Sequence, residues 1–351
     1  MSDSAPAENT IREQDLRKYE GPEVWRGDEL AARSDFEHVL TPDEIAEIEA
    51  ALRGVLESGL ELNSIGREAF PLPRFGERLR AAQTSLETGA GNLFLRGWPI
   101  ERWSEDENAK MFRGLSSHLG TPISQSAKGE ELFRVEDAGF ADNHPKARGP
   151  NTKKPLHFHC DRCDVIGFLC VRQARRGGDN FLVSSPAVHN EILDRRPDLL
   201  AELYRPWYYK THNVDTANDD PWCRQPIFAI EDGHFVGYVL RVLIDRAYQL
   251  PELPDMTESQ REALDLLDAV CAEPAMHYRL RQEPGDMLFV NNFVNFHSRS
   301  GFEDHLEPEK KRLLYRIWLS SPQSRPLPAL FSGSFGRTGA GEIRGGLHPS
   351  K

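Results

Sequence analysis

Short apolar stretches bounded by turn residues constrain the fold of this chain more than any other feature. Val165–Val171 and Met287–Asn291 are almost wholly apolar, and Gly177-Gly178-Asp179 and Pro284-Gly285-Asp286 stand beside them as turn signals. Stretches of this length with such boundaries are typical of strands in sandwiches and barrels. Further strands are expected at Asn92–Gly97, Leu156–Asp161, Phe181–Val183, Arg279–Gln282 and Lys311–Ser320.

Helices are expected around these strands. Thr41 can cap a helix in which Pro42 occupies the first turn and Glu44 completes a capping box. The apolar residues that follow recur at helical spacing on one face. Other helices are expected over residues 104–118, 186–195 and 257–272. Short strands mixed with peripheral helices predict an α+β fold with a β-sandwich centre.

The two ends of the chain differ from its middle. Residues 1–25 carry few large apolar side chains, so we expect a flexible N-terminal arm. Residues 26–321 are expected to form a single domain, and residues 322–351 a Gly/Pro-rich C-terminal tail. Residues 137–155 are rich in Gly, Pro, Asn and charge, which predicts a long surface loop.

The overall composition excludes several classes of partner. The chain has 43 basic and 55 acidic residues, a net charge of −12, which disfavours nucleic acid and anionic lipid. No apolar run approaches the length of a membrane span, and the polar N-terminus lacks the pattern of a secretory signal. Five cysteines in 351 residues fit a reducing compartment better than a disulfide framework. A cytoplasmic location is therefore expected.

A pattern of histidine and aspartate indicates a metal site. On a strand, His157, His159 and Asp161 share one face, because side chains alternate with period two. His297 stands at a strand end in a distant part of the sequence, so only the fold can bring it to this face. Two imidazoles and one carboxylate on one side of a metal leave positions open for a 2-oxo acid and dioxygen. That arrangement suits non-haem iron(II).

Two arginines follow the second histidine. Arg312 and Arg316 are four residues apart on the expected last strand, so they point to the same side. Each guanidinium can bind a carboxylate through two parallel hydrogen bonds. An anionic ligand near the metal is therefore expected.

Other interpretations of the same residues stay open. Cys160 and Cys163 have the spacing of a zinc pair, but a structural zinc site needs four ligands, and Cys160 points away from His159 on a strand. His157 can line the pocket or be exposed. The side chains that flank His297 can orient it, touch substrate or satisfy backbone groups of the turn. These side chains are Asn292, Asn295 and Arg299.

The stretches LHFHCDRCDVIGFLCVRQARRGGDNFLVSS and EPGDMLFVNNFVNFHSRSGFEDHLEPEKKRLLYRIWLS together resemble the taurine dioxygenase / 2,4-dichlorophenoxyacetate dioxygenase-like (TauD/TfdA) family of iron(II)/2-oxoglutarate oxygenases. The resemblance runs from about Leu93 to about Pro322. It implies a double-stranded β-helix (jelly-roll, cupin-like) core with flanking helices. It also implies that His159, Asp161 and His297 bind Fe(2+).

The same resemblance implies roles in co-substrate binding. Arg312 is expected to pair with the distal carboxylate of 2-oxoglutarate, and Arg316 to contact the co-substrate or an anionic substrate. Relatives often carry Thr or Ser after the Gly-Gly turn, where this chain has Asn180, whose amide can donate a similar hydrogen bond. Related halogenases replace the carboxylate ligand with a small residue, so Asp161 favours an oxygenase.

The expected activity is oxidation of a C–H bond in a small, anionic molecule, with 2-oxoglutarate and O2 as co-substrates and succinate and CO2 as products. Hydroxylation is the default outcome, and desaturation or ring formation stays open. A catalytically inactive jelly-roll binding module and a zinc protein are the alternatives. Homo-oligomers are common among soluble enzymes, and the sequence leaves the oligomeric state open.

Overall fold

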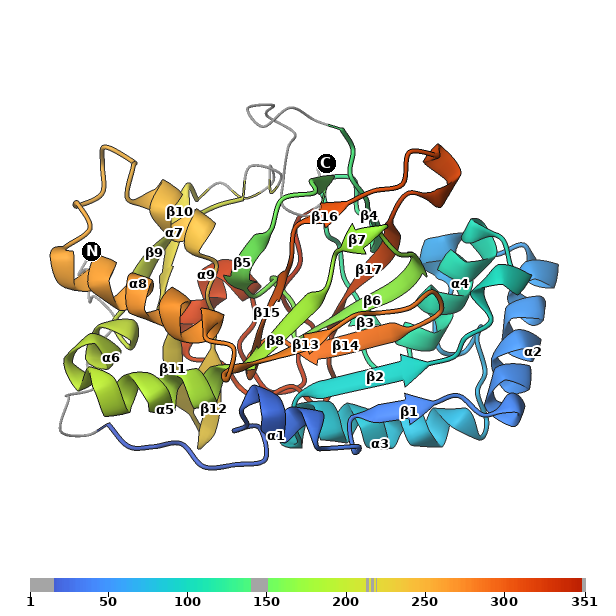
Figure 1. Ribbon diagram of the computed structural model, residues 1–351, viewed down its shortest axis with the longest axis horizontal. Helices are drawn as coiled ribbons and strands as arrows, with labels where there is room; N and C mark the ends of the chain where they lie inside the picture. The colour runs from blue at the N-terminus through green and yellow to red at the C-terminus, as the bar shows by residue number, and fades with distance from the viewer. Residues whose placement is uncertain (1–15, 140–150, 213–214, 216–217, 219, 349–351) are drawn as a thin grey trace, which may run out of the picture.

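Two β-sheets face each other at the centre of the protein, and helices cover their outer faces (Figure 1). The computed structural model describes residues 16–139, 151–212, 215, 218 and 220–348. The larger sheet has seven strands and the smaller sheet four.

The larger sheet runs in the order β1-β2-β14-β6-β17-β3, and β4 also pairs with β17. All its pairings are antiparallel except that of β1 with β2. Its strands are β1 (Glu37–Val39), β2 (Asn92–Arg96), β3 (Thr121–Pro122), β4 (Leu132–Val135), β6 (Val165–Arg172), β14 (Met287–Asn291) and β17 (Leu313–Ser320).

The smaller sheet runs in the order β13-β8-β15-β5 and is antiparallel throughout. Its strands are β5 (Leu156–His159), β8 (Asn180–Ser184), β13 (His277–Leu280) and β15 (Asn295–Arg299). A two-stranded pair, β7 (Arg176–Gly177) with β16 (Phe302–Glu303), lies beside it. Strands β5, β13 and β17 differ from expectation, because β5 ends before Asp161, β13 begins before Arg279 and β17 begins after Arg312.

Alternation along the central strands separates two cores. On β14, Met287 and Phe289 pack toward the helices, while Leu288 and Val290 pack between the sheets. Leu182 of β8 joins the core between the sheets from the opposite side. Burial of side chains of this size contributes about 1.5–3 kcal/mol each. Two facing antiparallel sheets with flanking helices confirm the predicted α+β jelly-roll.

Three helices cover the outer face of the larger sheet: α2 (Pro42–Ser58), α3 (Phe75–Thr88) and α4 (Glu105–Ser116) (Figure 1). The capping box of α2 is present, because the Thr41 side chain accepts from the Glu44 N–H and Glu44 accepts from the Thr41 N–H. Gly59 ends the helix in a left-handed conformation with φ of 66°.

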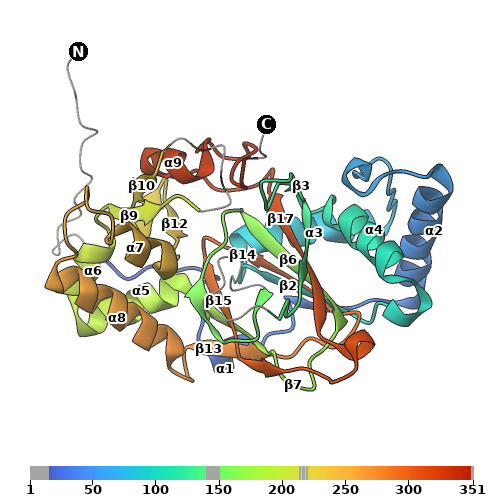
Figure 2. The ribbon, with the colours of Figure 1, turned by 90° about the horizontal axis from the view of Figure 1, so that it is seen from above.

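A second group of elements packs on the outer face of the smaller sheet, at the opposite end of the molecule (Figure 2). Phe158 and Phe296 of the smaller sheet contribute to this core. The helices are α5 (Ser185–Arg195), α6 (Pro197–Leu203), α7 (Arg241–Ala247) and α8 (Glu258–Ala272). The strands are β9 (Trp207–Lys210), β10 (Trp222–Gln225), β11 (Phe228–Glu231) and β12 (His234–Gly237).

Both ends of the described chain pack on this frame. Residues 1–15 of the expected arm lie outside the described residues, but Leu16 is buried and the Tyr19 backbone exchanges hydrogen bonds with Asn190 of α5. The packed chain therefore begins earlier than residue 26. The short helices α1 (Gly27–Ala31) and α9 (Ser332–Phe335) lie near the two ends. Leu347 reaches the core between the sheets.

Two other expectations concern segments of the surface. Residues 140–150 of the loop expected at 137–155 lie outside the described residues. In the described ranges, no helix combines the length and the apolar character needed to cross a lipid bilayer.

Candidate metal and co-substrate site

Two neighbouring strands of the smaller sheet carry the two histidines. His297 on β15 is the direct cross-strand partner of His159 at the end of β5. Their imidazole rings lie 4.4 Å apart between centroids. Side chains of directly opposed residues project to the same face of a sheet, so the pairing itself brings the rings together.

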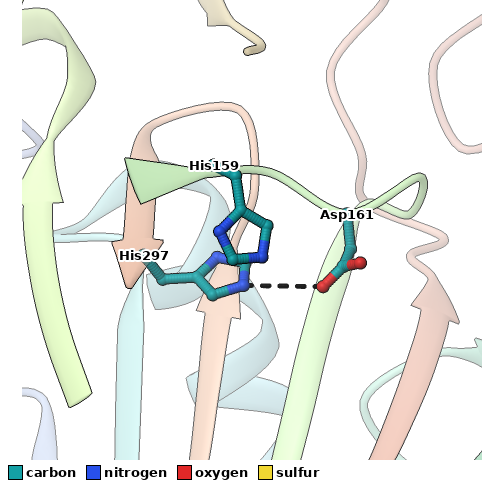
Figure 3. Close-up of side chains that lie close together, drawn as sticks. All are labelled: His159, Asp161 and His297. Carbon is teal, nitrogen blue, oxygen red and sulfur yellow. Dashed lines mark ion pairs between the residues drawn. The ribbon is translucent and has the colours of Figure 1, made fainter. Parts of the chain in front are cut away.

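Asp161 completes the cluster from the segment that follows β5 (Figure 3). Its Oδ2 lies 3.5 Å from Nε2 of His297. One ligand atom from each of the three residues lies within 4.8 Å of the others. Among the residues that the structure describes, this is the one group of three such side chains able to hold a metal ion.

The surroundings of His159 prepare it as a ligand. The Nδ1–H donates to the backbone carbonyl of His157 over 2.8 Å, which leaves Nε2 as the lone-pair nitrogen. Burial and the neighbouring His297 lower the pKa of His159 to about 4. The imidazole is therefore neutral at physiological pH, which is the form that binds metals.

Asp161 is held as a carboxylate mainly by Arg316. Burial raises the pKa of Asp161, but the Arg316 charge and the interactions with the two histidines outweigh that effect and lower the pKa well below its usual value. Arg316 Nη1 lies 3.4 Å from Asp161 Oδ1, and its Nε donates to Gln125 over 2.8 Å. Asp161 Oδ2 is buried with no hydrogen-bond partner among the described residues. An unpaired buried carboxylate oxygen beside two imidazoles fits a cation.

The segment that carries Asp161 is fixed by Asn292. The Asn292 side chain accepts from the Asp161 N–H over 3.2 Å and donates to the Cys163 carbonyl and sulfur. The Cys160 thiol donates to the Asn292 carbonyl. Burial raises the pKa of both thiols, and neither sulfur belongs to the cluster of possible metal ligands among the described residues. The zinc interpretation has no support in this arrangement.

Arg312 lies in a different environment from Arg316. It is 1% exposed, and its Nε and Nη1 have no partner within the described part of the chain. Burial lowers its pKa to about 10, so it stays cationic. A Cβ added to Gly178 would lie 3.0 Å from Arg312 Nε, so the glycine lets the guanidinium lie close to the backbone of this turn. Two unpaired buried donors fit a carboxylate.

Asn180 lies at the start of β8, close to this part of the site. Nδ2 donates one hydrogen to Gln282 Oε1 over 2.8 Å, and Gln282 Nε2 donates to the carbonyls of Phe168 and Asp286. The bond to Gln282 orients the Asn180 amide and uses one of its two donors, so the second hydrogen of Nδ2 stays available for the expected bond to the co-substrate.

The structure also gives the contacts of the other residues that the sequence suggested for the site. His157 is exposed and contributes its carbonyl, and Asn295 donates to the carbonyls of Ala90 and Gly91. Gln125, which holds Arg316, was not identified from the sequence, because it lies in no motif and far from both histidines.

The same fold occurs in a solved iron oxygenase. The asparagine oxygenase solved with Fe(II), 2S,3S-3-hydroxyasparagine and succinate aligns with a TM-score of 0.62 and 16% identity. The alignment covers 81% of this chain and 93% of that chain.

Two curated proteins are similar in sequence. FR-33289 synthase of Streptomyces rubellomurinus is 29% identical over 89% of this chain and 93% of its own length. The taurine hydroxylase-like protein SAT17 of Stachybotrys chartarum is 26% identical over 84% of this chain and 77% of its own length.

The jelly-roll, the cluster of two histidines and one aspartate, and these similarities define an oxygenase that depends on non-haem iron(II) and 2-oxoglutarate. The profile of the family described as "Taurine catabolism dioxygenase TauD, TfdA family" matches residues 58–318. The chain belongs to the TauD/TfdA family.

Proposed function

We propose that His159, Asp161 and His297 bind the iron(II) of this oxygenase. Three ligand atoms within 4.8 Å of one another, one of them an unpaired buried carboxylate oxygen, are the observation that carries the proposal. The ligand set is the two-histidine, one-carboxylate set of non-haem iron oxygenases. It leaves coordination positions for a bidentate 2-oxo acid and dioxygen.

Arg312 binds the distal carboxylate of 2-oxoglutarate in this proposal. The support is its burial with two unpaired guanidinium nitrogens, packed against the Gly178 backbone. Asn180 and Arg316 were the other expected co-substrate contacts. Asn180 can donate through the second hydrogen of Nδ2, because one hydrogen serves Gln282. Arg316 contacts Asp161 Oδ1, whereas Oδ2 is the oxygen near His297.

The bound iron, 2-oxoglutarate and O2 supply the oxidant for a substrate C–H bond and yield succinate and CO2. The side chains and backbone of the protein orient the proposed metal ligands and set their charge. The His157 carbonyl holds the proton of His159 at Nδ1, and Arg316 keeps Asp161 ionised. Phe168 lies against His297, with ring centroids 6.1 Å apart, and shields that ligand from water.

The substrate of the proposed reaction is a small anionic molecule, and the outcome is hydroxylation. The buried Arg316 beside Asp161 supports an anion near the metal. The names of similar proteins agree, because taurine carries a sulfonate and the asparagine oxygenase was solved with a hydroxylated amino acid.

We further propose a single folded domain in the cytoplasm. Trp25 and Leu347 share the core between the two sheets, which supports one domain over nearly the whole described chain. All five cysteines are free thiols, as is usual in a reducing compartment. Whether the chain forms a homo-oligomer is tested by its mass in solution.

Replacing a metal ligand should weaken iron binding. His159→Ala, Asp161→Ala and His297→Ala are each expected to weaken Fe(II) binding by at least about tenfold, because the loss of a residue that only orients a metal ligand already has an effect of about that size. Anaerobic equilibrium dialysis measures Fe(II) binding, and succinate release measures turnover of 2-oxoglutarate.

Cys160→Ser is the matched control, since this residue adjoins Asp161 but lies on the opposite face, in the outer core. Serine can keep the hydrogen bond to the Asn292 carbonyl, so Fe(II) binding should persist. Full Fe(II) binding by either histidine variant would show that the ligand assignment is wrong.

A further inference from the structure

A second arginine lies beside Arg312 in the interior. The guanidinium carbon of Arg299 is 4.9 Å from the centroid of the Phe302 ring, and that of Arg312 is 5.1 Å from the same centroid. Arg299 is 5% exposed. Asp137 lies near enough to Arg299, and Asp304 to Arg312, to act on the guanidinium charges, but no ion pair joins them among the described residues. Two buried cations therefore share one ring without a directly paired carboxylate.

The strand places Arg299 toward the site. It follows His297 by two residues on β15, so both side chains project to the same face. Its cross-strand partner on β8 is Asn180. Nη2 of Arg299 donates to the carbonyls of Thr152 and Lys154, just before β5. Nε is buried with no partner among the described residues.

The charges of this pair favour an anion between them. Buried charges without a directly paired counter-charge are unfavourable, and two like charges in a low dielectric add repulsion. A carboxylate placed between the guanidinium groups would reverse both effects.

We propose that Arg299 and Arg312 together form the subsite for the distal carboxylate of the 2-oxo acid co-substrate. This inference rests on the proposed function of Arg312. Arg312 provides two unpaired donors, and Arg299 provides a second charge with one unpaired donor at Nε. The paired charge selects a 2-oxo acid that ends in a carboxylate over an uncharged 2-oxo acid of equal length.

The same arrangement connects the co-substrate to the entry of β5. Arg299 uses Nη2 to hold the backbone at Thr152 and Lys154, and β5 carries His159 a few residues later. A carboxylate bound at Arg299 Nε would therefore hold the same guanidinium that binds the backbone before β5.

Two 2-oxo acids that differ in the distal carboxylate distinguish recognition of that carboxylate from a general distortion of the site. Protein loaded with Fe(II) under anaerobic conditions is titrated with 2-oxoglutarate or with 2-oxovalerate, which has the same five carbons and no distal carboxylate. Both chelate the iron through the 2-oxo acid end, and the visible charge-transfer absorption of the chelate gives the dissociation constant. No turnover is needed for this readout.

Arg299→Gln is expected to raise the dissociation constant for 2-oxoglutarate about ten- to a hundredfold, the size of a lost charged hydrogen bond. The constant for 2-oxovalerate should change less than about threefold. Arg299→Lys should recover part of the affinity for 2-oxoglutarate, because it restores the charge without the planar guanidinium. Equal weakening of both ligands, or no weakening of either, would overturn the proposal.

Arg175→Gln is the charge-matched control. Arg175 is exposed and pairs with Glu303 on the surface, so its loss should leave both constants unchanged. If Arg299→Gln does not fold, Arg312→Gln is measured in its place. Arg299 is still present in that variant, so 2-oxoglutarate should bind more tightly than 2-oxovalerate. Equal affinities for the two acids would contradict a role for Arg299.

If neither acid binds to the iron-loaded wild-type protein, the proposed function itself is wrong.

Discussion

At the scale of single residues, the site depends on a backbone carbonyl and on a glycine, as well as on reactive side chains. The His157 carbonyl selects the tautomer of His159, and the missing side chain of Gly178 lets the Arg312 guanidinium lie close to the backbone. Gly178 has φ of 76°, a conformation that residues with a Cβ rarely adopt. Its role is therefore both conformational and steric.

Gly178→Ala should impair co-substrate binding as well as folding. The positive φ costs about 1–2 kcal/mol for an L-residue. The added Cβ would also lie 3.0 Å from Arg312 Nε and push the guanidinium out of place. We expect the dissociation constant for 2-oxoglutarate to rise about tenfold, equivalent to about 1.4 kcal/mol. Anaerobic titration of the iron-loaded variant measures it.

Gly233→Ala is the control for backbone strain. Gly233 has a similar φ of 80°, but an added Cβ there would meet nothing within 4 Å. Both variants should lose similar stability in urea unfolding, and only Gly178→Ala should lose affinity. Similar affinities in the two variants would contradict the assigned place of the co-substrate.

At the scale of elements, a single strand serves both the core and the site. On β17, Tyr315 and Ile317 pack toward the helices, whereas Leu314 and Trp318 face the interior of the jelly-roll. Arg316 lies on the interior face by the same alternation. The apolar side therefore anchors the strand while the other side presents a cation to Asp161.

The helix α5 carries a histidine that should make stability depend on pH. His189 is 1% exposed, accepts a hydrogen bond from the Tyr204 hydroxyl at Nε2, and burial lowers its pKa to about 4. The pKa in the unfolded chain is about 6.5. Because the folded-state pKa is the lower one, this contribution is complete above about pH 6.5 and is lost as the pH falls toward 4, by about 3 kcal/mol.

His189→Gln keeps an acceptor for Tyr204 but does not titrate. The free energy of unfolding of this variant, measured in urea from pH 7.5 to 4.5, should fall less steeply than that of the wild type. The difference between the two proteins should be largest at pH 7.5 and shrink toward pH 4.5. Parallel curves would show that His189 is not the group that takes up the proton.

At the scale of the whole molecule, the C-terminal segment holds the loop that carries Asp161. Arg344 is fully buried and donates to Asp164 over 2.7 Å, three residues after Asp161. Asp164 also accepts from the Ser321 N–H. Gly346 donates to the Arg162 carbonyl. The C-terminal segment, expected to be a tail, therefore packs against the loop that follows Asp161 and holds it in place.

Arg344→Met should destabilise the protein and loosen the metal site. Loss of one partner of a buried ion pair costs about 3–5 kcal/mol, because the Asp164 charge stays buried without compensation. Urea unfolding measures this loss, and anaerobic dialysis should show weaker Fe(II) binding by the folded protein.

The double variant Asp164→Asn/Arg344→Met removes both charges and should recover part of the stability. Arg175→Met, which breaks the exposed pair with Glu303, should cost at most about 1 kcal/mol. If Arg344→Met were as mild as Arg175→Met, the C-terminal segment would not support the loop.

Much of this protein could be predicted from local sequence patterns. The capping box at Thr41 and the apolar strand β14 are both present as expected. These features depend on neighbours within a few residues, so a local pattern contains the necessary information. The end of β5 at His159 was not predicted, because the turn that breaks it is fixed by Asn292, more than a hundred residues away.

The sequence by itself determined which residue types are available to a metal and on which face of a strand they lie. Only the tertiary structure decided that His297 pairs across from His159, that Gln125 and Asp161 share Arg316, and that Arg299 lies beside Arg312. Alternation along a strand is a local property of the backbone. Contacts between distant segments depend on strand register and packing, which only the folded chain defines.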